Sequence, residues 1–458
     1  MTDRFDVVVL GMGPGGEVAA DRLLRAGQRV AVVERELIGG ECGYWGCIPS
    51  KTLLRAPDAR AEAGRAAGVT EPALDWPALR DYRDYMIRHL DDSKQVAGYA
   101  EQGATVVKAA GRLAGRTGDD LLRVEADGRT LETSHVIVAT GSEAIRPPID
   151  GLGADSDVAV WTNREATTLR EVPDRVLMLG GSAVAVELGQ FLARMGSQVT
   201  LVARGGRLLT REDPRVGELS RDALAADGID LRLGRQARRV TRHGSGARVE
   251  LDDGATVEVD VVVLGTGRAP RTAGLGLETV GVDVDASSGG LRVDEHCRFG
   301  DGLWAIGDVT GQAMFTHVAK YQGRVAADNI LGRARAARYD GIPRVIFSDP
   351  EVAAVGLTAA QAHDRGLTTA AVEVDLPQAI ARPWTYETDP RGTLGLLSDR
   401  DRRVLVGAWA VAPMAGEWIH QAALAIRVGV GLDVLLDQVA QFPTYTEAYL
   451  TALERLDA

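Results

Sequence analysis

The sequence predicts an α/β protein that contains two Rossmann-like dinucleotide-binding domains. Two glycine-rich turns, each placed between an apolar run and a helical pattern, predict this class of fold. A parallel strand that enters a helix through such a turn is the unit from which doubly wound sheets are built. The length of 458 residues agrees, because a chain of this size divides into two to four domains.

The first glycine-rich turn lies near the N-terminus. An apolar run over residues 5–10 is typical of a buried parallel strand, and a helical pattern follows over 17–26. A second strand over 29–33 ends at Glu34, an acid placed to accept hydrogen bonds from an adenosine ribose. The glycines that let a backbone approach a pyrophosphate are Gly11, Gly13 and Gly16. These features together predict a dinucleotide site.

Two of the three cysteines lie close together after this second strand. Cys42 and Cys47 are five positions apart, and Lys51 follows four positions beyond. This spacing lets one helical turn bring the two sulfurs within bonding reach. A disulfide with a lysine nearby indicates a redox centre rather than a structural crosslink, although two unconnected thiols are the alternative. The third cysteine, Cys297, is expected to be a small buried hydrophobe.

The second glycine-rich turn is a weaker copy of the first. A strand over 175–179 leads into Gly180, and helical and strand patterns follow over 186–195 and 198–202. Ser182 and Ala185 stand where the pattern usually has glycine. No acid closes the second strand here; Ala203 is followed by two arginines, Arg204 and Arg207. Arginines at this place suit a ribose 2′-phosphate and favour NADPH, with NADH possible if both are ordinary surface arginines.

Two dinucleotide sites in one chain imply electron transfer between two cofactors. We expect a tightly bound flavin at the first site and a diffusible nicotinamide at the second. A strand over 136–138 that runs into Thr140 and Gly141 supports the flavin site. So does a strand that ends in Gly307-Asp308, because a carboxylate there can bind a ribityl hydroxyl.

The composition restricts the classes of partner. The hydrophobic content of 45% and the charged content of 25% are typical of a globular protein. A net charge of −12 argues against nucleic acid or an anionic membrane as the main partner. The few cysteines and the lack of a secretory pattern favour the cytoplasm. No metal site is predicted, and a small-molecule electron acceptor is the expected partner.

These motifs, together with Gly265-Thr266-Gly267-Arg268, make the chain resemble the flavoprotein disulfide reductases over nearly its whole length. Glutathione reductase, dihydrolipoamide dehydrogenase and mercuric reductase belong to this family. The resemblance implies an FAD-binding domain split into residues 1–150 and 271–335, and an NADPH-binding domain over 151–270. It also implies an α+β dimerisation domain over 340–458, and a homodimer whose active site is shared between subunits.

The resemblance also implies roles for individual residues. Cys47 would be the sulfur beside the flavin, and Cys42 would exchange with the acceptor. Lys51 would lie against the flavin ring and pair with Glu187. The expected FAD contacts are Gly11, Gly13, Gly16, Glu34, Lys51, Gly111, Thr140, Gly141, Asp308 and His317. The expected NADPH contacts are Gly180, Ser182, Ala185, Glu187, Arg204, Arg207 and Gly267.

The chain departs from the family near its C-terminus. Relatives that reduce thiol substrates carry a histidine before Pro-Thr, but Phe442 fills that position, while Glu447 keeps the position of the supporting glutamate. Phenylalanine cannot move a proton, and general acid–base catalysis is worth roughly 10²–10⁴-fold. Tyr445 and Glu447 are the candidate substitutes. Tyrosine is a poor base at neutral pH, and Tyr445 also fits the role of an interface aromatic.

The sequence is therefore consistent with three functions. The first is an FAD-dependent oxidoreductase that passes electrons from NADPH through the Cys42–Cys47 disulfide to a disulfide or another soft acceptor. The second is electron transfer from the flavin itself to a quinone, a dye or a second nicotinamide, with the disulfide accessory. The third is a non-catalytic binding or sensing role, which the presence of Lys51, Glu187 and both cysteines argues against. The segment 199–214 is most similar to mercuric reductase, but the C-terminal cysteine pair of that enzyme is missing.

Overall fold

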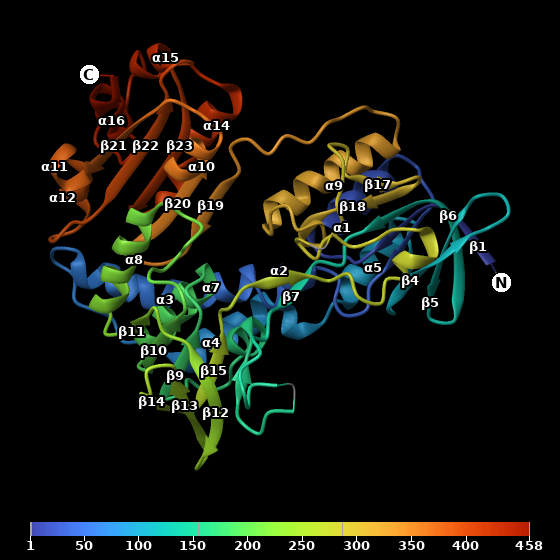
Figure 1. Ribbon diagram of the computed structural model, residues 1–458, viewed down its shortest axis with the longest axis horizontal. Coiled ribbons are helices and arrows are strands. Elements are labelled where there is room, and N and C mark those ends of the chain that lie inside the picture. The colour runs from blue at the N-terminus through green and yellow to red at the C-terminus, as the bar shows by residue number, and fades with distance from the viewer. Residues whose placement is uncertain (1, 154, 286, 458) are drawn as a thin grey trace. The chain divides into compact units, whose positions relative to one another are not determined.

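The computed structural model describes residues 2–153, 155–285 and 287–457 (Figure 1). The chain forms two compact units, each assembled from three separate segments. Unit 1 comprises Met1–Ser50, Asp81–Ile145 and Arg268–Arg338, and unit 2 comprises Lys51–Arg80, Arg146–Gly267 and Tyr339–Ala458. The α/β fold class predicted from the sequence is confirmed in both units.

Unit 1 is built on an eight-stranded sheet. Its main path runs β17 (Arg298–Gly300), β18 (Leu303–Ala305), β6 (Arg129–Val138), β1 (Thr2–Leu10), β2 (Val30–Val33) and β3 (Thr105–Val107). The strands β4 (Gly111–Arg116) and β5 (Leu122–Ala126) extend it through β6. β1 pairs in parallel with β2 and β6, so the carboxyl ends of the central strands meet at one edge.

Two helices of unit 1 pack closely through small residues. α1 (Pro14–Arg25) and α9 (Thr316–Ile330) lie side by side (Figure 1). A Cβ atom on Gly323 would lie 2.6 Å from the carbonyl oxygen of Gly15. α1 begins three residues earlier than the sequence pattern suggests. Pro14 occupies the first helical turn, where its missing N–H is not needed.

Other short elements of unit 1 surround this sheet. They are α2 (Gly40–Tyr44), the 3₁₀ turn η1 (Arg88–Leu90), α5 (Ser93–Glu101), β7 (Ser142–Ala144), β16 (Arg268–Pro270) and η3 (Gly307–Thr310). Two further helices, α3 (Cys47–Arg65) and α4 (Trp76–Met86), have residues in both units. A buried hydrophobic cluster, to which β1 to β6 and β18 all contribute, forms the core of this unit.

Unit 2 contains a parallel sheet that carries the second glycine-rich turn. Its order is β11 (Asp230–Leu233), β10 (Gln198–Ala203), β9 (Arg175–Leu179), β15 (Val261–Leu264) and β8 (Val160–Trp161). Beside these strands are α6 (Asn163–Thr167), α7 (Ala183–Arg194) and α8 (Pro214–Ala226). A separate antiparallel sheet consists of β12 (Ala237–His243), β13 (Gly246–Leu251) and β14 (Thr256–Val259).

The C-terminal part of unit 2 is an antiparallel sheet with helices. The strand order is β19 (Pro343–Ile346), β20 (Glu351–Gly356), β23 (Val404–Ala412), β22 (Thr393–Asp399) and β21 (Thr369–Asp375). The helices are α10 (Ala359–Asp364), α11 (Leu376–Ala379), α12 (Arg382–Tyr386), α13 (Ala415–Trp418), α14 (His420–Val428), α15 (Leu432–Leu436) and α16 (Glu447–Asp457). Among the described helices, none has both the length and the apolar character that a bilayer span requires.

Candidate active site

Two of the three predicted glycines of the first turn, Gly11 and Gly16, cannot carry a side chain without movement of the backbone, whereas nothing lies within 4 Å of a Cβ on Gly13. Gly11 has φ = 97°, and a Cβ atom there would lie 2.5 Å from the carbonyl oxygen of Ala139. A Cβ atom on Gly16 would lie 2.1 Å from the carbonyl oxygen of Gly11. The turn therefore brings three backbone segments together at the N-terminus of α1. Exposed backbone N–H groups at such a helix end are suited to bind a pyrophosphate.

Glu34 and Asp308 place carboxylates at the same edge of the unit 1 sheet. Glu34 is buried at the end of β2 and accepts hydrogen bonds from the backbone N–H of Met12 at 2.8 Å and of Glu36 at 2.7 Å. The Ser142 hydroxyl donates to Asp308 at 2.6 Å, and burial raises the pKa of Asp308. The glycine turn and the two acids fit a dinucleotide that carries a ribityl chain, as FAD does.

The remaining residues expected at the flavin lie in the same unit. Gly111 packs over the ends of β1 and β2, because a Cβ there would meet Leu10 at 2.8 Å and Val33 at 2.9 Å. Thr140 donates its hydroxyl to the carbonyl of Arg271 at 2.8 Å, and Gly141 follows with φ = 73°. His317 is exposed, and its ring stacks on Phe315 with centroids 5.2 Å apart.

Two of the three cysteines of unit 1, Cys42 and Cys47, lie side by side as thiols. Cys42 is on α2, and Cys47 is the first residue of α3. A hydrogen bond to Cys47, together with burial, raises the pKa of the Cys42 thiol, while Thr316 and Lys320 act in the opposite direction. The Thr316 hydroxyl lies 3.3 Å from Cys47 Sγ. Sequence reasoning missed Thr316, because only its neighbour His317 had been singled out.

The structure brings Lys51 and Glu187 together in unit 2. Lys51 Nζ lies 2.6 Å from Glu187 Oε2, and the buried carboxylate also accepts the backbone N–H of Phe347 at 2.9 Å. The ammonium group lies 4.7 Å from the centre of the Phe347 ring. Phe347 therefore contacts both charged groups, which sequence reasoning did not foresee.

In the second glycine-rich turn, Ser182 and Ala185 replace the usual glycines, and the facing residue Gly265 accommodates both. Gly180 has φ = 113°, and a Cβ there would lie 2.2 Å from the carbonyl oxygen of Gly265. The Ser182 hydroxyl donates to the same carbonyl at 2.8 Å. A Cβ on Gly265 would lie 2.7 Å from the methyl of Ala185, so a glycine at 265 makes room for the alanine. The backbone thus keeps the shape that a nucleotide turn needs.

The basic residues expected at the nicotinamide nucleotide lie beyond β10. Arg204 is exposed, and Arg207 donates to the carbonyl of Thr210 at 3.3 Å. Gly267 has φ = 111° at the end of this unit's middle segment. Arg204 and Arg207 are therefore placed near the carboxyl end of a parallel strand, where nucleotide riboses bind in such sheets.

Tyr445 lies in the core of the C-terminal sheet and helices. Its side chain is 4% exposed, stacks on Trp418 with centroids 6.2 Å apart and meets Tyr386 edge-on at 6.2 Å. Burial raises its pKa above the ordinary value, which makes it a still poorer base. Glu447 begins α16, and its buried Oε2 has no hydrogen-bond partner among the described residues. Phe442 is 73% exposed.

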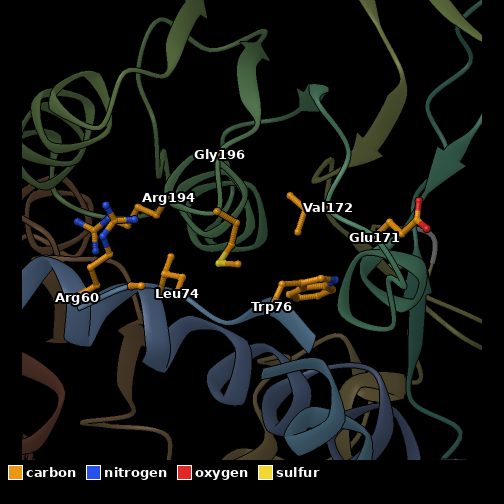
Figure 2. Close-up of a pocket in the computed structure, with 9 residues that line it drawn as sticks. Arg60, Leu74, Trp76, Glu171, Val172, Arg194 and Gly196 are labelled. Carbon is orange, nitrogen blue, oxygen red and sulfur yellow. The ribbon is translucent and has the colours of Figure 1, made fainter. Parts of the chain in front are cut away.

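Unit 2 also contains a cavity of about 600 Å³. Figure 2 shows its lining, in which Trp76 and Val172 lie apart from the basic side chains of Arg60 and Arg194. The cavity is bordered by residues that precede β9 and by Gly196, just beyond α7. It therefore lies at the amino ends of the strands, whereas nucleotides bind at the carboxyl ends. Nothing in the sequence pattern had pointed to it.

Most of the chain matches one family of known proteins. The family described as Pyridine nucleotide-disulphide oxidoreductase matches residues 5–323, and its dimerisation domain matches residues 342–453. This chain belongs to that family. The resemblance inferred from the motifs is confirmed, and the protein is an FAD-dependent NAD(P)H oxidoreductase of the disulfide reductase type.

Individual members of the family are similar over their full lengths. The mercuric reductase of Streptomyces lividans is 35% identical, covering 98% of this chain and 96% of that one. The dihydrolipoyl dehydrogenase of Thermus scotoductus is 33% identical, with 99% and 97% covered. The crystal structure of LpdA from Mycobacterium tuberculosis has a TM-score of 0.87 at 28% identity, with 100% of both chains covered.

A further similar structure is that of a metal complex. It is the Cu(II) complex of the HOCl-induced flavoprotein disulfide reductase RclA from Escherichia coli, with a TM-score of 0.86 at 26% identity. The alignment covers 98% of this chain and 99% of RclA. The similar proteins therefore include a mercuric reductase, a dihydrolipoyl dehydrogenase and a protein solved with Cu(II), although they share the fold.

Proposed function

We propose that this oxidoreductase takes hydride from NADPH and passes the electrons through FAD to Cys42 and Cys47, and from there to a small disulfide or another soft acceptor. The observation that carries the proposal is the pair of adjacent thiols in the same unit as the glycine turn and Asp308. When bound, FAD supplies the two-electron carrier between the nicotinamide and the disulfide. Arg204 and Arg207 support NADPH, because guanidinium groups bind a 2′-phosphate.

The surroundings of Cys47 favour its thiolate. As the first residue of α3, Cys47 lies at the positive end of a helix dipole. Thr316 adds a hydroxyl within hydrogen-bond reach of its sulfur. These contacts support Cys47 as the sulfur that holds charge after reduction, and Cys42 as the one that meets the acceptor.

The acceptor side offers little help with proton transfer. Phe442 has no titratable group, and Tyr445 is held in the core by its aromatic neighbours. This favours an acceptor whose reduction needs few protons. A soft metal ion is such an acceptor, and it deserves a test because mercuric reductases are among the relatives and RclA has a Cu(II) complex.

The electron path is tested by anaerobic titration with NADPH. We expect a long-wavelength absorption band from the Cys47 thiolate next to the flavin, which Cys47→Ser abolishes and Cys42→Ser retains. Cys297→Ser is the matched control, since this cysteine is buried and far along the chain from the pair. Direct bleaching of the flavin without any band would reject the proposal. Quinone turnover that survives both active-site substitutions would favour transfer from the flavin itself.

The missing base is tested with Phe442→His. Because acid–base help is worth roughly 10²–10⁴-fold, we expect the variant to turn over small disulfides at least tenfold faster. Reduction of Hg²⁺ or Cu²⁺ should change much less. Unchanged disulfide turnover would mean that residue 442 does not limit the reaction.

A further inference from the structure

A short backbone segment of unit 1 is strained although it contains no glycine. Arg88, His89 and Leu90 have φ values of 54°, 52° and 60°, which is a left-handed turn of three L-residues. The turn is closed by hydrogen bonds from Leu90 N to the Ile87 carbonyl and from Asp91 N to the Arg88 carbonyl, both at 3.0 Å. Such strain persists only where neighbouring contacts hold it, and it often marks a functional region.

The first of these contacts fastens the segment before the redox cysteines. Asp92 is buried just beyond the turn, and its carboxylate accepts the backbone N–H of Ile38 at 2.8 Å. Lys108 joins the same carboxylate to the backbone carbonyl of Glu36. Residues 36–38 are thus tied down immediately before the two glycines that lead into α2.

The second contact covers the residue that lies between the cysteines. Tyr44 is 0% exposed, and its hydroxyl donates to the Ile38 carbonyl at 3.2 Å. The guanidinium carbon of Arg88 lies 5.8 Å from the centre of the Tyr44 ring. In the amide orientation that satisfies both its oxygen and its nitrogen, Gln95 accepts from Arg88 Nε at 2.7 Å and from Nη2 at 3.2 Å. We call Arg88, Asp92 and Gln95 the clamp.

Tyr44 and Cys42 belong to the same short helix, α2, so contacts on one fix the other. We propose that the clamp holds α2 in place and thereby sets the reduction potential of the Cys42–Cys47 pair. Arg88 and Asp92 act as positioning residues, because neither contact involves the sulfurs directly. The inference rests on the proposed function, since it takes these two cysteines as the redox centre.

The clamp sets the reduction potential through the effective concentration of one thiol near the other. When the loop already holds the two sulfurs within bonding distance, forming the disulfide costs little further conformational entropy. The disulfide is therefore favoured over the dithiol. Reduction breaks the Cys42–Cys47 bond and takes up two electrons and two protons. A dithiol reagent supplies both while it closes into its own cyclic disulfide. Loosening α2 should therefore favour the dithiol.

The test equilibrates the FAD-loaded enzyme anaerobically with mixtures of reduced and oxidised dithiothreitol. Alkylation followed by mass spectrometry of the Cys42 peptide gives the fraction of dithiol. For Arg88→Leu we expect a shift of at least tenfold toward the dithiol, or about 30 mV for a two-electron couple. Arg88→Lys keeps a cation over the ring and should shift the equilibrium less. Tyr44→Phe, which loses the hydrogen bonds of the hydroxyl to Ile38 and Arg88 but keeps the ring, should shift it a few-fold.

Control variants distinguish the loss of the clamp contacts from a general loss of stability. Arg298 lies over the Trp304 ring at 5.9 Å in the same unit, so Arg298→Leu removes a contact of the same kind and should leave the equilibrium unchanged. Asp92→Asn is a second, nearly isosteric variant, for which we expect a shift in the same direction as for Arg88→Leu. The Arg88→Leu/Tyr44→Phe double variant should shift less than the product of the single effects, because both act on one helix.

The inference is overturned if Arg88→Leu or Asp92→Asn retains FAD and shows the wild-type equilibrium. Equal shifts for Arg298→Leu and Arg88→Leu would also overturn it. Failure of the proposed function looks different, because NADPH would then fail to reduce the pair in the unmodified enzyme. The dithiothreitol equilibrium does not depend on NADPH, so the two failures can be told apart.

Discussion

The two glycine-rich turns have the same strand–turn–helix plan but meet its steric demands differently. In the first turn, Gly16 must lack a side chain because the Gly11 carbonyl lies where its Cβ would be. In the second turn, Ala185 has a Cβ, and Gly265, the residue just after β15, leaves the space for it. The strand after the first turn ends just before the buried Glu34, and the strand after the second turn ends just before the exposed Arg204. The shape of each turn thus depends on the segment that faces it, and we predict that the residue at the end of the second strand sets which nucleotide binds.

Gly16→Ala should have the largest effect. The added methyl would lie 2.1 Å from a backbone oxygen, so the turn must move. We expect loss of most bound FAD, measured from the visible absorbance of the purified protein. Gly98→Ala in α5 is the control, because nothing lies within 4 Å of its Cβ position. Full FAD occupancy in Gly16→Ala would contradict the steric comparison.

The helices that follow the two turns end in charge clusters with opposite pH behaviour. At the end of α7, Arg194 binds Asp58 at 2.9 Å, and it also contacts Asp227 and Asp349. Burial raises the pKa of Asp58 to about 7, from an ordinary value of 3.8. At the end of α1, Asp328 is paired with Arg22, and its pKa is lowered by its two arginine partners although burial opposes this.

The sign of each effect follows from which state binds more protons. Between about pH 4 and pH 7 the folded state holds a proton on Asp58 that the unfolded state has lost, so stability falls as pH rises. The fall is on the order of 2–4 kcal/mol. Asp328 behaves oppositely: its contribution is present above its unfolded pKa and is lost as pH falls through the lower folded value. Denaturant melts of Asp58→Asn should lose part of the pH slope; an unchanged slope would refute this.

Replacing both arginines beyond β10 with alanine tests the strand-end rule. If Arg204 and Arg207 bind a 2′-phosphate, the double variant should raise KM for NADPH at least tenfold, because even one charged hydrogen bond is worth roughly 1.5–3 kcal/mol. KM for NADH should change little. Steady-state kinetics with both nucleotides measure the ratio, and parallel increases would show that these side chains do not discriminate.

Ser182→Ala should have the smallest effect. It removes one hydrogen bond to the Gly265 carbonyl, 2.8 Å long, and leaves the backbone of the turn intact. We expect the free energy of unfolding to fall by about 1 kcal/mol, with nucleotide affinity nearly unchanged. A tenfold loss of NADPH affinity would instead mean that the hydroxyl contacts the nucleotide.

The sequence predicted those parts of the fold and site that are encoded locally. The strand over 175–179 matches β9 residue for residue, and the predicted glycine turn precedes α1 with Pro14 in its first turn. The proximity of Thr316 and Cys47 could not be predicted, since they are 269 positions apart and meet only in the folded unit. The turn at 88–90 has no glycine to reveal its left-handed backbone. The core position of Tyr445 depends equally on distant aromatic partners.

The close approach of Ala185 and Gly265 means that the two positions should vary together among homologues. A glycine at 185 would remove the nearest contact of a methyl group at 265, leaving the Cα atom of residue 185 at 3.1 Å, while a methyl at both would force the two segments apart. Attempts to convert the nicotinamide domain to another nucleotide should therefore exchange these two positions as a pair. Grafting a standard fingerprint into the turn alone would leave a void against β15.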